Sequence, residues 1–176
     1  MEWLDRKEVL NRISRGLLDY SVGEATITLR GGINARTGKQ SIIEIGSILV
    51  LNTRGRLVDY DWTPPVSKEL LFRRDLHICA YCGGQFGERQ LSMDHVHPQS
   101  RGGANTWTNL VSACLPCNQR KGNRRPEEAG MQLLYVPYAL NRAESLILSN
   151  RRILGDQMQF LSQRIPKHSR VLQLIH

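Results

Sequence analysis

Residues 79–118 read CAYCGGQFGERQLSMDHVHPQSRGGANTWTNLVSACLPCN and contain all four cysteines of the chain. The cysteines form two Cys-x-x-Cys pairs, Cys79 with Cys82 and Cys114 with Cys117, which are separated by 31 residues. A tight turn between two cysteines directs both sulfurs at one ion, and two such turns complete a tetrahedral site. The spacing therefore predicts a structural Zn²⁺ ion with four thiolate ligands.

Two other uses of paired cysteines compete with zinc. Disulfides are disfavoured in the cytoplasm, where thiols stay reduced. We expect a cytoplasmic protein that does not enter the membrane, because no apolar run is long enough to span one and the N-terminal segment resembles an amphipathic helix rather than a secretory signal. A redox motif needs only one pair, in a thioredoxin-like βαβ setting that the sequence does not show. Zinc is thus the favoured interpretation.

Between and beside the cysteine pairs lie side chains suited to hydrolysis. Asp94 offers a hard carboxylate and Asn118 a carbonyl oxygen, both suited to Mg²⁺ or Mn²⁺. His95 offers an imidazole, which exchanges protons near neutral pH and suits a general base. If zinc brings residues 94–95 and 118–121 together, the matching reaction is metal-assisted phosphodiester hydrolysis. The candidate phosphate contacts are Arg101, Arg120, Lys121, Arg124 and Arg125.

The charge distribution agrees with an anionic partner. The formal net charge is +8, and residues 79–125 carry six basic and two acidic side chains. A basic surplus centred on one segment favours a polyanion, with nucleic acid as the leading candidate. Many basic proteins bind nothing specific, so charge alone leaves both interpretations open.

The run CAYCG…LSMDHVHPQSRGGANTWTNLVSACLPCNQRKGNRRPEEA resembles the HNH endonuclease family of the zinc-binding, ββα-metal type, over about residues 72–130. The resemblance implies an α+β protein with a ββα-metal (His-Me finger) core. It implies that His95 is the general base, that Asp94 and Asn118 bind the catalytic metal, and that Asn109 fixes the loop and orients His95. It also implies DNA cleavage that leaves 5′-phosphate and 3′-hydroxyl ends. The alternative is a zinc-dependent DNA-binding module without catalysis, which would need neither a base nor a hard-metal site.

Periodicity and turn residues predict the remaining organisation. We expect three parts: an N-terminal extension with a helix and a β-hairpin (1–70), the nuclease domain (71–130) and a C-terminal helical extension (131–176). The sequence leaves open whether the protein is a monomer or a homodimer, and whether it nicks one strand or cuts both. The predicted helices are 2–20, one that begins after Ser67, 116–123, 125–136 and 142–165; the predicted strands are 24–30, 41–52, 91–98 and 109–114, with a turn at 53–55.

Overall fold

The N-terminal helix α1 (Arg6–Ser14) is defined by a capping box. The Asp5 side chain accepts a hydrogen bond from the backbone nitrogen of Glu8, and the Glu8 side chain accepts one from the backbone nitrogen of Asp5, both at 2.8 Å. The helix is shorter than the predicted 2–20 because Gly16 turns the chain with a φ of 67° and a strand begins at Leu18. Reciprocal capping satisfies backbone donors that the first turn leaves without partners.

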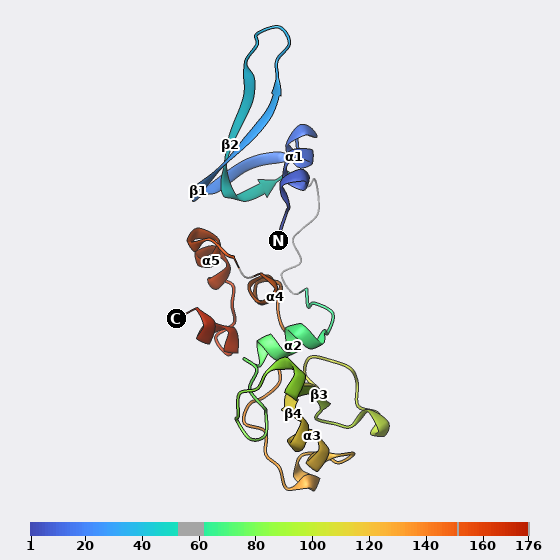
Figure 1. Ribbon diagram of the computed structural model, residues 1–176. Helices are drawn as coiled ribbons and strands as arrows, with labels where there is room; N and C mark the ends of the chain where they lie inside the picture. Colours follow the sequence, from blue (N-terminus) through green and yellow to red (C-terminus); the bar gives the residue numbers. More distant parts are fainter. Residues whose placement is uncertain (53–61, 151, 176) are drawn as a thin grey trace. The chain divides into compact units, whose positions relative to one another are not determined.

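A long antiparallel hairpin follows, formed by β1 (Leu18–Ile33) and β2 (Gln40–Leu51), and Figure 1 shows it as an extended two-stranded ribbon. Its turn is organised by Asn34, whose side-chain oxygen accepts hydrogen bonds from the backbone nitrogens of Arg36 and Thr37. The hairpin predicted from 24–30 and 41–52 is confirmed, and both strands start earlier in the sequence than predicted. The predicted turn at 53–55 lies outside the described residues.

The computed structural model describes residues 1–52, 62–150 and 152–175. The chain forms two compact units. Their described residues are 1–52, 150 and 152–164 for the first, and 62–149 and 165–175 for the second. In the first unit, α5 (Gly155–Ser162) is joined to β2, since the side chain of Gln157 donates to the carbonyl oxygen of Ser47 at 3.0 Å. The predicted three-part division of the chain stays a prediction.

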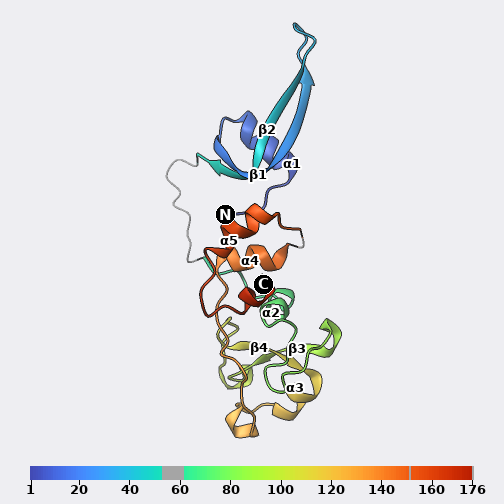
Figure 2. The same ribbon diagram turned by 90° about the vertical axis from the view of Figure 1, so that its left-hand side faces the viewer.

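The second unit contains the segment with the four cysteines. The short strands β3 (Leu91–His95) and β4 (Leu110–Cys114) pair in antiparallel register, with Asp94 opposite Val111 and His95 opposite Leu110. Helix α3 (Leu115–Lys121) follows β4 without a loop and ends at Gly122, as predicted. Figure 2 shows these two strands beside α3. With antiparallel pairs and separate helices, the fold class is α+β.

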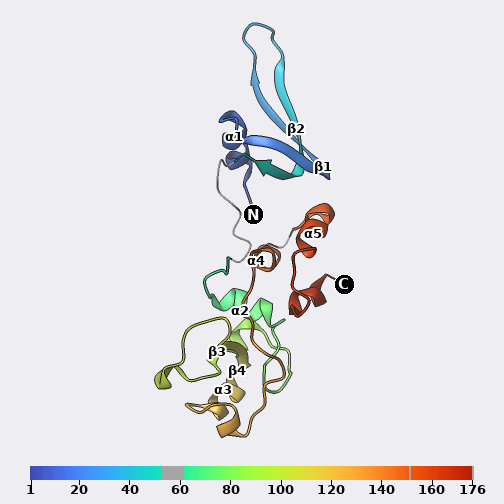
Figure 3. The same ribbon diagram turned by 180° about the vertical axis from the view of Figure 1, so that it is seen from behind.

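Helix α2 (Lys68–Arg74) covers the two strands, as Figures 1 and 3 show. It begins at Ser67, whose hydroxyl accepts from the backbone nitrogen of Leu70 at 3.2 Å, so the predicted N-cap is confirmed. The fully buried side chains of this unit include Leu71, Phe72, Leu110 and Val111. Burial of this apolar surface stabilises α2 against β4.

Two helices predicted in the C-terminal half were wrong in extent. The predicted helix over 125–136 is only a single 3₁₀ turn (Glu127–Ala129), because Gly130 adopts a left-handed conformation with a φ of 62° and ends it. The predicted helix over 142–165 is two separate helices, α4 (Arg142–Ser149) and α5. The chain ends with a 3₁₀ segment (Arg170–Leu174). Within the described residues, no helix is both long and apolar enough to span a membrane.

Candidate metal centre and catalytic pocket

The four cysteines converge on one point. All four Sγ atoms lie within 4.8 Å of one another, and those of Cys82 and Cys114 are 3.9 Å apart. Four sulfurs bound tetrahedrally at 2.3 Å from a zinc ion lie about 3.8 Å from each other. Cys79 and Cys114 are buried, whereas Cys82 is exposed at the edge of the cluster. The donor set and its spacing fit a structural zinc site of the kind that the sequence predicts.

Local backbone geometry builds this cluster. In the first pair, the backbone nitrogen of Gly83 donates to the carbonyl oxygen of Cys79 at 3.0 Å, and Gly83 has a φ of 74° that favours glycine. The second pair spans the junction from β4 to α3, where Cys114 is the N-cap residue and Pro116 lies in the first turn. A hydrogen bond from the backbone nitrogen of Ala80 to the carbonyl oxygen of Ser112 joins the two pairs.

The thiols of the cluster differ in acidity. Burial raises the pKa of the Cys114 and Cys117 thiols above their ordinary value. Burial acts on Cys79 in the same direction, but backbone N–H groups, first that of Cys114 and then that of Cys82, bring the pKa of Cys79 below its ordinary value. A metal that binds as a thiolate complex must therefore displace protons from Cys114 and Cys117.

A pocket of about 440 Å³ opens beside the cluster. It brings together three of the four predicted catalytic residues: Asp94 and His95 from the end of β3, and Asn118 from α3. Neighbouring residues on a regular strand face opposite sides, but His95 is the last residue of β3, and both residues line the pocket. The complete lining is Met93, Asp94, His95, Pro98, Gln99, Ser100, Asn118, Lys121, Gly122 and Asn123.

The carboxylate of Asp94 is buried and accepts hydrogen bonds on both oxygens. The ammonium of Lys121 lies 2.8 Å from Oδ1, and the hydroxyl of Tyr81 donates to Oδ2. Lys121 was predicted to contact phosphate, but only 1% of its side chain is exposed, and its ammonium also donates to the carbonyl oxygen of His95 at 2.7 Å. The ammonium of Lys121 thus binds the Asp94 carboxylate and the His95 carbonyl inside the protein and does not face solvent.

Sequence reasoning missed Tyr81, which lies between the two cysteines of the first pair. Burial, and then the hydrogen bond to Asp94, raises the pKa of Tyr81 far above its ordinary value, so the phenol remains a donor. One signal was available: a residue between two ligands of one metal has its backbone position fixed by that metal. A half-buried phenol at such a position is suited to holding a neighbouring acceptor.

His95 and Asn118 are held in different ways. The Nε2 atom of His95 is buried and has no hydrogen-bond partner among the described residues. The side-chain nitrogen of Asn118 donates to Oγ of Ser92 at 2.8 Å, and Ser92 in turn donates to the carbonyl oxygen of Ala113 at 3.1 Å. With its nitrogen anchored to β3, Asn118 offers its carbonyl oxygen as the ligand atom.

Asn109 fixes the chain immediately after His95. Its side-chain oxygen accepts from the backbone nitrogen of His97 at 2.8 Å, and its side-chain nitrogen donates to the carbonyl oxygens of His97 and Ala104 at 3.1 and 2.9 Å. The backbone of Gly103 also lies against this turn, since a Cβ atom there would be 1.8 Å from the carbonyl oxygen of His97. The loop-fixing contacts expected of Asn109 are therefore present, and its effect on the His95 side chain stays a prediction.

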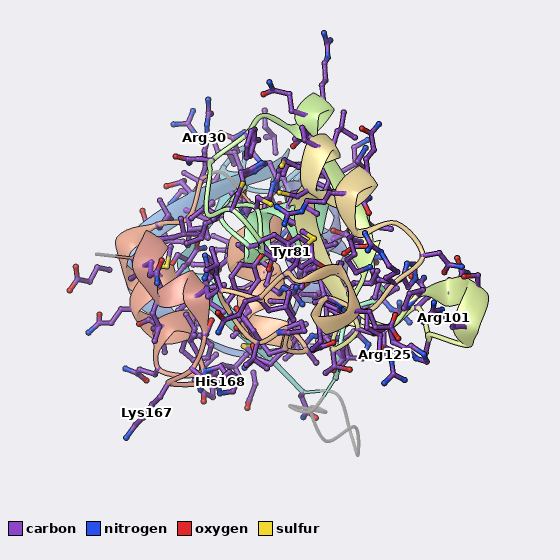
Figure 4. The ribbon with its side chains drawn as sticks, turned by 90° about the horizontal axis from the view of Figure 1, so that it is seen from below. Arg30, Tyr81, Arg101, Arg125, Lys167 and His168 are labelled. Atoms are coloured by element: carbon purple, nitrogen blue, oxygen red, sulfur yellow. The ribbon has the colours of Figure 1, made fainter. Side chains whose placement is uncertain are left out.

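The four remaining arginines predicted to bind phosphate are exposed. Arg101 forms two hydrogen bonds with the carboxylate of Glu128, at 2.7 and 3.0 Å, and Glu128 also accepts from the backbone nitrogen of Arg125 at 2.9 Å. That backbone N–H, together with the guanidinium of Arg101, lowers the pKa of Glu128. Figure 4 shows Arg101 and Arg125 toward the same side of the molecule, and Tyr81 near the middle of the view. Arg124 donates to the carbonyl oxygens of Arg120 and Lys121 at the end of α3.

A buried ion pair that sequence reasoning also missed supports β4 from the other side. Arg74 and Asp75 are fully buried, with Nε of Arg74 2.8 Å from Oδ1 of Asp75. The guanidinium donates to the carbonyl oxygens of Trp107 and Leu110, and Asp75 accepts from the backbone nitrogen of Ser112 at 2.7 Å. These bonds connect α2 to both ends of the segment 107–110, which carries Asn109. Because each charged group has a partner, the charges of the buried pair are compensated.

Comparisons with known proteins point to one family. Residues 79–134 match the family described as HNH endonuclease. Over 46 residues, the chain is 48% identical to the CRISPR-associated endonuclease Cas9 of Corynebacterium diphtheriae, a match that spans 26% of this chain and 4% of that protein. The Type II-C Cas9 enzyme from Actinomyces naeslundii is a similar solved structure, with a TM-score of 0.33 and 23% identity over 60% of this chain and 11% of that one. The chain thus corresponds to a small part of the length of either protein.

Proposed function

We propose that this chain is a metal-dependent endonuclease that hydrolyses phosphodiester bonds of DNA. The match of residues 79–134 to the HNH endonuclease family supports this proposal. The observation that carries the proposal is the single pocket lined by Asp94, His95 and Asn118. We assign the strands β3 and β4 with helix α3 to a ββα-metal core, held together by zinc on the four cysteines. We place the hydrolytic site in the pocket between the end of β3 and α3.

Asp94 and Asn118 are the residues that would hold the catalytic divalent cation. A carboxylate and an amide oxygen form a hard donor set suited to Mg²⁺ or Mn²⁺. When bound, the cation supplies charge stabilisation to the phosphate as negative charge builds up during hydrolysis. The half-buried amide–hydroxyl contact between Asn118 and Ser92 keeps the second donor in a fixed orientation.

His95 is the proposed general base. Its imidazole takes a proton from a water molecule, the water oxygen bonds to phosphorus, and the bond from phosphorus to the 3′ oxygen breaks. The 3′ oxygen then takes up a proton, so the products carry a 5′-phosphate and a 3′-hydroxyl. The Nε2 atom of His95 has no partner among the described residues, so no acceptor or donor of the fold competes for it there. Asn109 supports this geometry by fixing the backbone two residues further on.

Exposed arginines beside the pocket would position the DNA backbone. Arg120, Arg124 and Arg125 follow Asn118 in the chain, and Arg101 lies on the loop that follows β3. Phosphate contacts of this kind hold the duplex without reading its sequence. Lys121 contributes through the pocket instead, because its ammonium is bonded to Asp94.

Plasmid cleavage tests the proposal. Pure protein is incubated with supercoiled plasmid and Mg²⁺ or Mn²⁺, with and without EDTA, and the same assay is run on His95→Ala. We expect nicked or linear DNA that requires the added cation and is lost in the variant. His168→Gln is the matched control, because His168 packs edge to face against Tyr138 and does not line the pocket, so the cleavage by this variant should equal that of the unmodified protein. Undiminished cleavage by His95→Ala would refute the assignment of the base.

A second function, a zinc-dependent DNA-binding module without catalysis, is favoured by one observation. Both oxygens of Asp94 already accept hydrogen bonds from the chain, so its charge is balanced by Lys121 without a metal. This function predicts DNA binding that persists with no cleavage under any divalent cation. The plasmid assay, combined with a gel-shift measurement on the same protein, separates the two.

A further inference from the structure

The two donors that hold the Asp94 carboxylate come from the two cysteine pairs. Tyr81 lies inside the first pair, where its backbone nitrogen is 3.5 Å from Sγ of Cys79, and its hydroxyl donates to Oδ2 of Asp94. Lys121 lies one turn after Cys117 on α3, and its ammonium donates to Oδ1. The metal cluster and the carboxylate are therefore joined by two side chains, each anchored beside one pair of thiols.

This arrangement fixes the plane of the carboxylate. Asp94 is 5% exposed, so solvent does not supply alternative partners for its oxygens. With donors on both oxygens, rotation of the carboxylate about its χ2 angle would break at least one buried hydrogen bond. Without the phenol, the remaining partner is the ammonium of Lys121, which carries a positive charge that competes with a cation for the same group.

We propose that Tyr81 is a positioning residue. Because the four-cysteine site fixes the position of Tyr81, its hydroxyl holds the Asp94 carboxylate in one orientation and so sets the affinity of Asp94 for the catalytic cation. This inference rests on the proposed nuclease function, since it concerns the metal ligand of that site. Tyr81 does not touch the reacting atoms. Removal of such an outer hydrogen-bond partner lowers metal affinity or activity by about 10–100-fold.

Mn²⁺ binding to zinc-loaded protein tests the proposal without reference to catalysis. Tyr81→Phe removes the hydroxyl and keeps the ring that packs against the buried cluster of Cys79, Ala113 and Cys114. The matched control is Tyr135→Phe, which removes another half-buried hydroxyl of the same unit, one that donates to the carbonyl oxygen of Ile78. Electron paramagnetic resonance of free Mn²⁺ gives the affinity. We expect about a 10–100-fold weaker affinity in Tyr81→Phe and an unchanged affinity in Tyr135→Phe.

Two companion measurements separate positioning from general stability. Metal analysis should find the same zinc content in both variants, and their thermal unfolding should agree. In the plasmid assay, the Mn²⁺ concentration that gives half-maximal cleavage should rise by the same factor as the dissociation constant. The rate at saturating Mn²⁺ should stay within a few-fold of that of the unmodified protein, because Tyr81 acts on metal binding.

The other outcomes would refute either the role of Tyr81 alone or the nuclease function together with it. Equal Mn²⁺ affinity in Tyr81→Phe and the unmodified protein, in a preparation that cleaves DNA, refutes the role of Tyr81 and leaves the nuclease function intact. Loss of zinc together with Mn²⁺ affinity would make Tyr81 a structural residue of the thiol cluster, which also refutes the inference. Unmodified protein that neither binds Mn²⁺ nor cleaves DNA would overturn the proposed function and this inference together.

Discussion

The pair formed by Lys121 and Asp94 gives the sharpest quantitative prediction for stability. The side chains are 1% and 6% exposed, and Nζ lies 2.8 Å from Oδ1, so solvent screens their interaction very little. Replacement of one partner leaves the other charge buried and uncompensated, which costs about 3–5 kcal/mol in comparable pairs. We therefore expect Lys121→Met and Asp94→Asn each to lower the free energy of unfolding of the zinc-loaded, Mg²⁺-free protein by that amount.

The double variant distinguishes pairing from simple loss of packing. Because it removes both charges, its cost should fall short of the sum of the single variants by about 2–3 kcal/mol. Arg120→Met is the control, since Arg120 is the exposed neighbour on the same helix and its replacement should change stability by less than about 0.5 kcal/mol. Urea unfolding, followed by circular dichroism and by the fluorescence of buried Trp107, measures these free energies.

Mn²⁺ provides a second check on the same pair. Once the ammonium is gone from Lys121→Met, a divalent cation can balance Asp94, and Mn²⁺ at about 100 times its dissociation constant should restore about 2.7 kcal/mol. A loss of less than about 1 kcal/mol of unfolding free energy in Lys121→Met would contradict a buried pair of this strength. So would a double variant whose loss equals the sum of the two single losses. Either result would mean that water or local rearrangement compensates the Asp94 carboxylate.

Three further predictions concern the loop, the thiols and the DNA contact. Gly103→Ala should destabilise the protein by about 2–3 kcal/mol in thermal unfolding, since its Cβ would lie 1.8 Å from the carbonyl oxygen of His97. A variant as stable as the unmodified protein would show that the backbone of this turn moves to relieve the clash. Burial raises the pKa of Cys117, so its thiol stays protonated in metal-free protein at neutral pH, and zinc affinity in chelator competition should keep rising as pH increases through about 8; a plateau below that pH would contradict this. Arg125→Ala should reduce the slope of log binding constant against log salt by about 0.9, whereas Arg89→Ala, at an exposed site in the 3₁₀ turn before β3, should leave it unchanged.

The parts of the fold that sequence predicted well are those that local chemistry determines. The spacing of the cysteine pairs anticipated the cluster of four sulfurs, and alternating apolar residues anticipated the hairpin of β1 and β2. The strands β3 and β4 and the helix α3 lie close to their predicted ranges. By contrast, the helix expected over 125–136 was wrong in extent, because Pro126, Glu127 and Glu128 favour a helix start but the left-handed backbone of Gly130 ends the turn.

In the candidate site, sequence predicted which residue types take part but not which side chains hydrogen-bond to each other. Residue type identified Asp94, His95 and Asn118, and the pocket brings them together. The partner of Lys121 could not be read from its type, because a lysine in a basic run resembles a phosphate contact. Its spacing held the information: residues 118 and 121 are three apart on a helix and share a face, so both face the pocket. The contact of Tyr81 with Asp94 depends on how two distant segments meet, which no local pattern specifies.

The two proposed metals therefore have separable duties. The sulfur site would join the turn that carries Tyr81 to the start of α3, the helix that carries Lys121, so loss of its ion would release both partners of Asp94 together. The oxygen site differs, because the ammonium of Lys121 already lies 2.8 Å from the buried Asp94 carboxylate and compensates its charge. On the proposed function, the fold would depend on zinc, whereas hydrolysis would depend on both ions. If the catalytic cation binds Asp94 as proposed, the ammonium of Lys121 must move away from the carboxylate or share it with the cation. Lys121 would then affect both the stability of the domain and its proposed reaction.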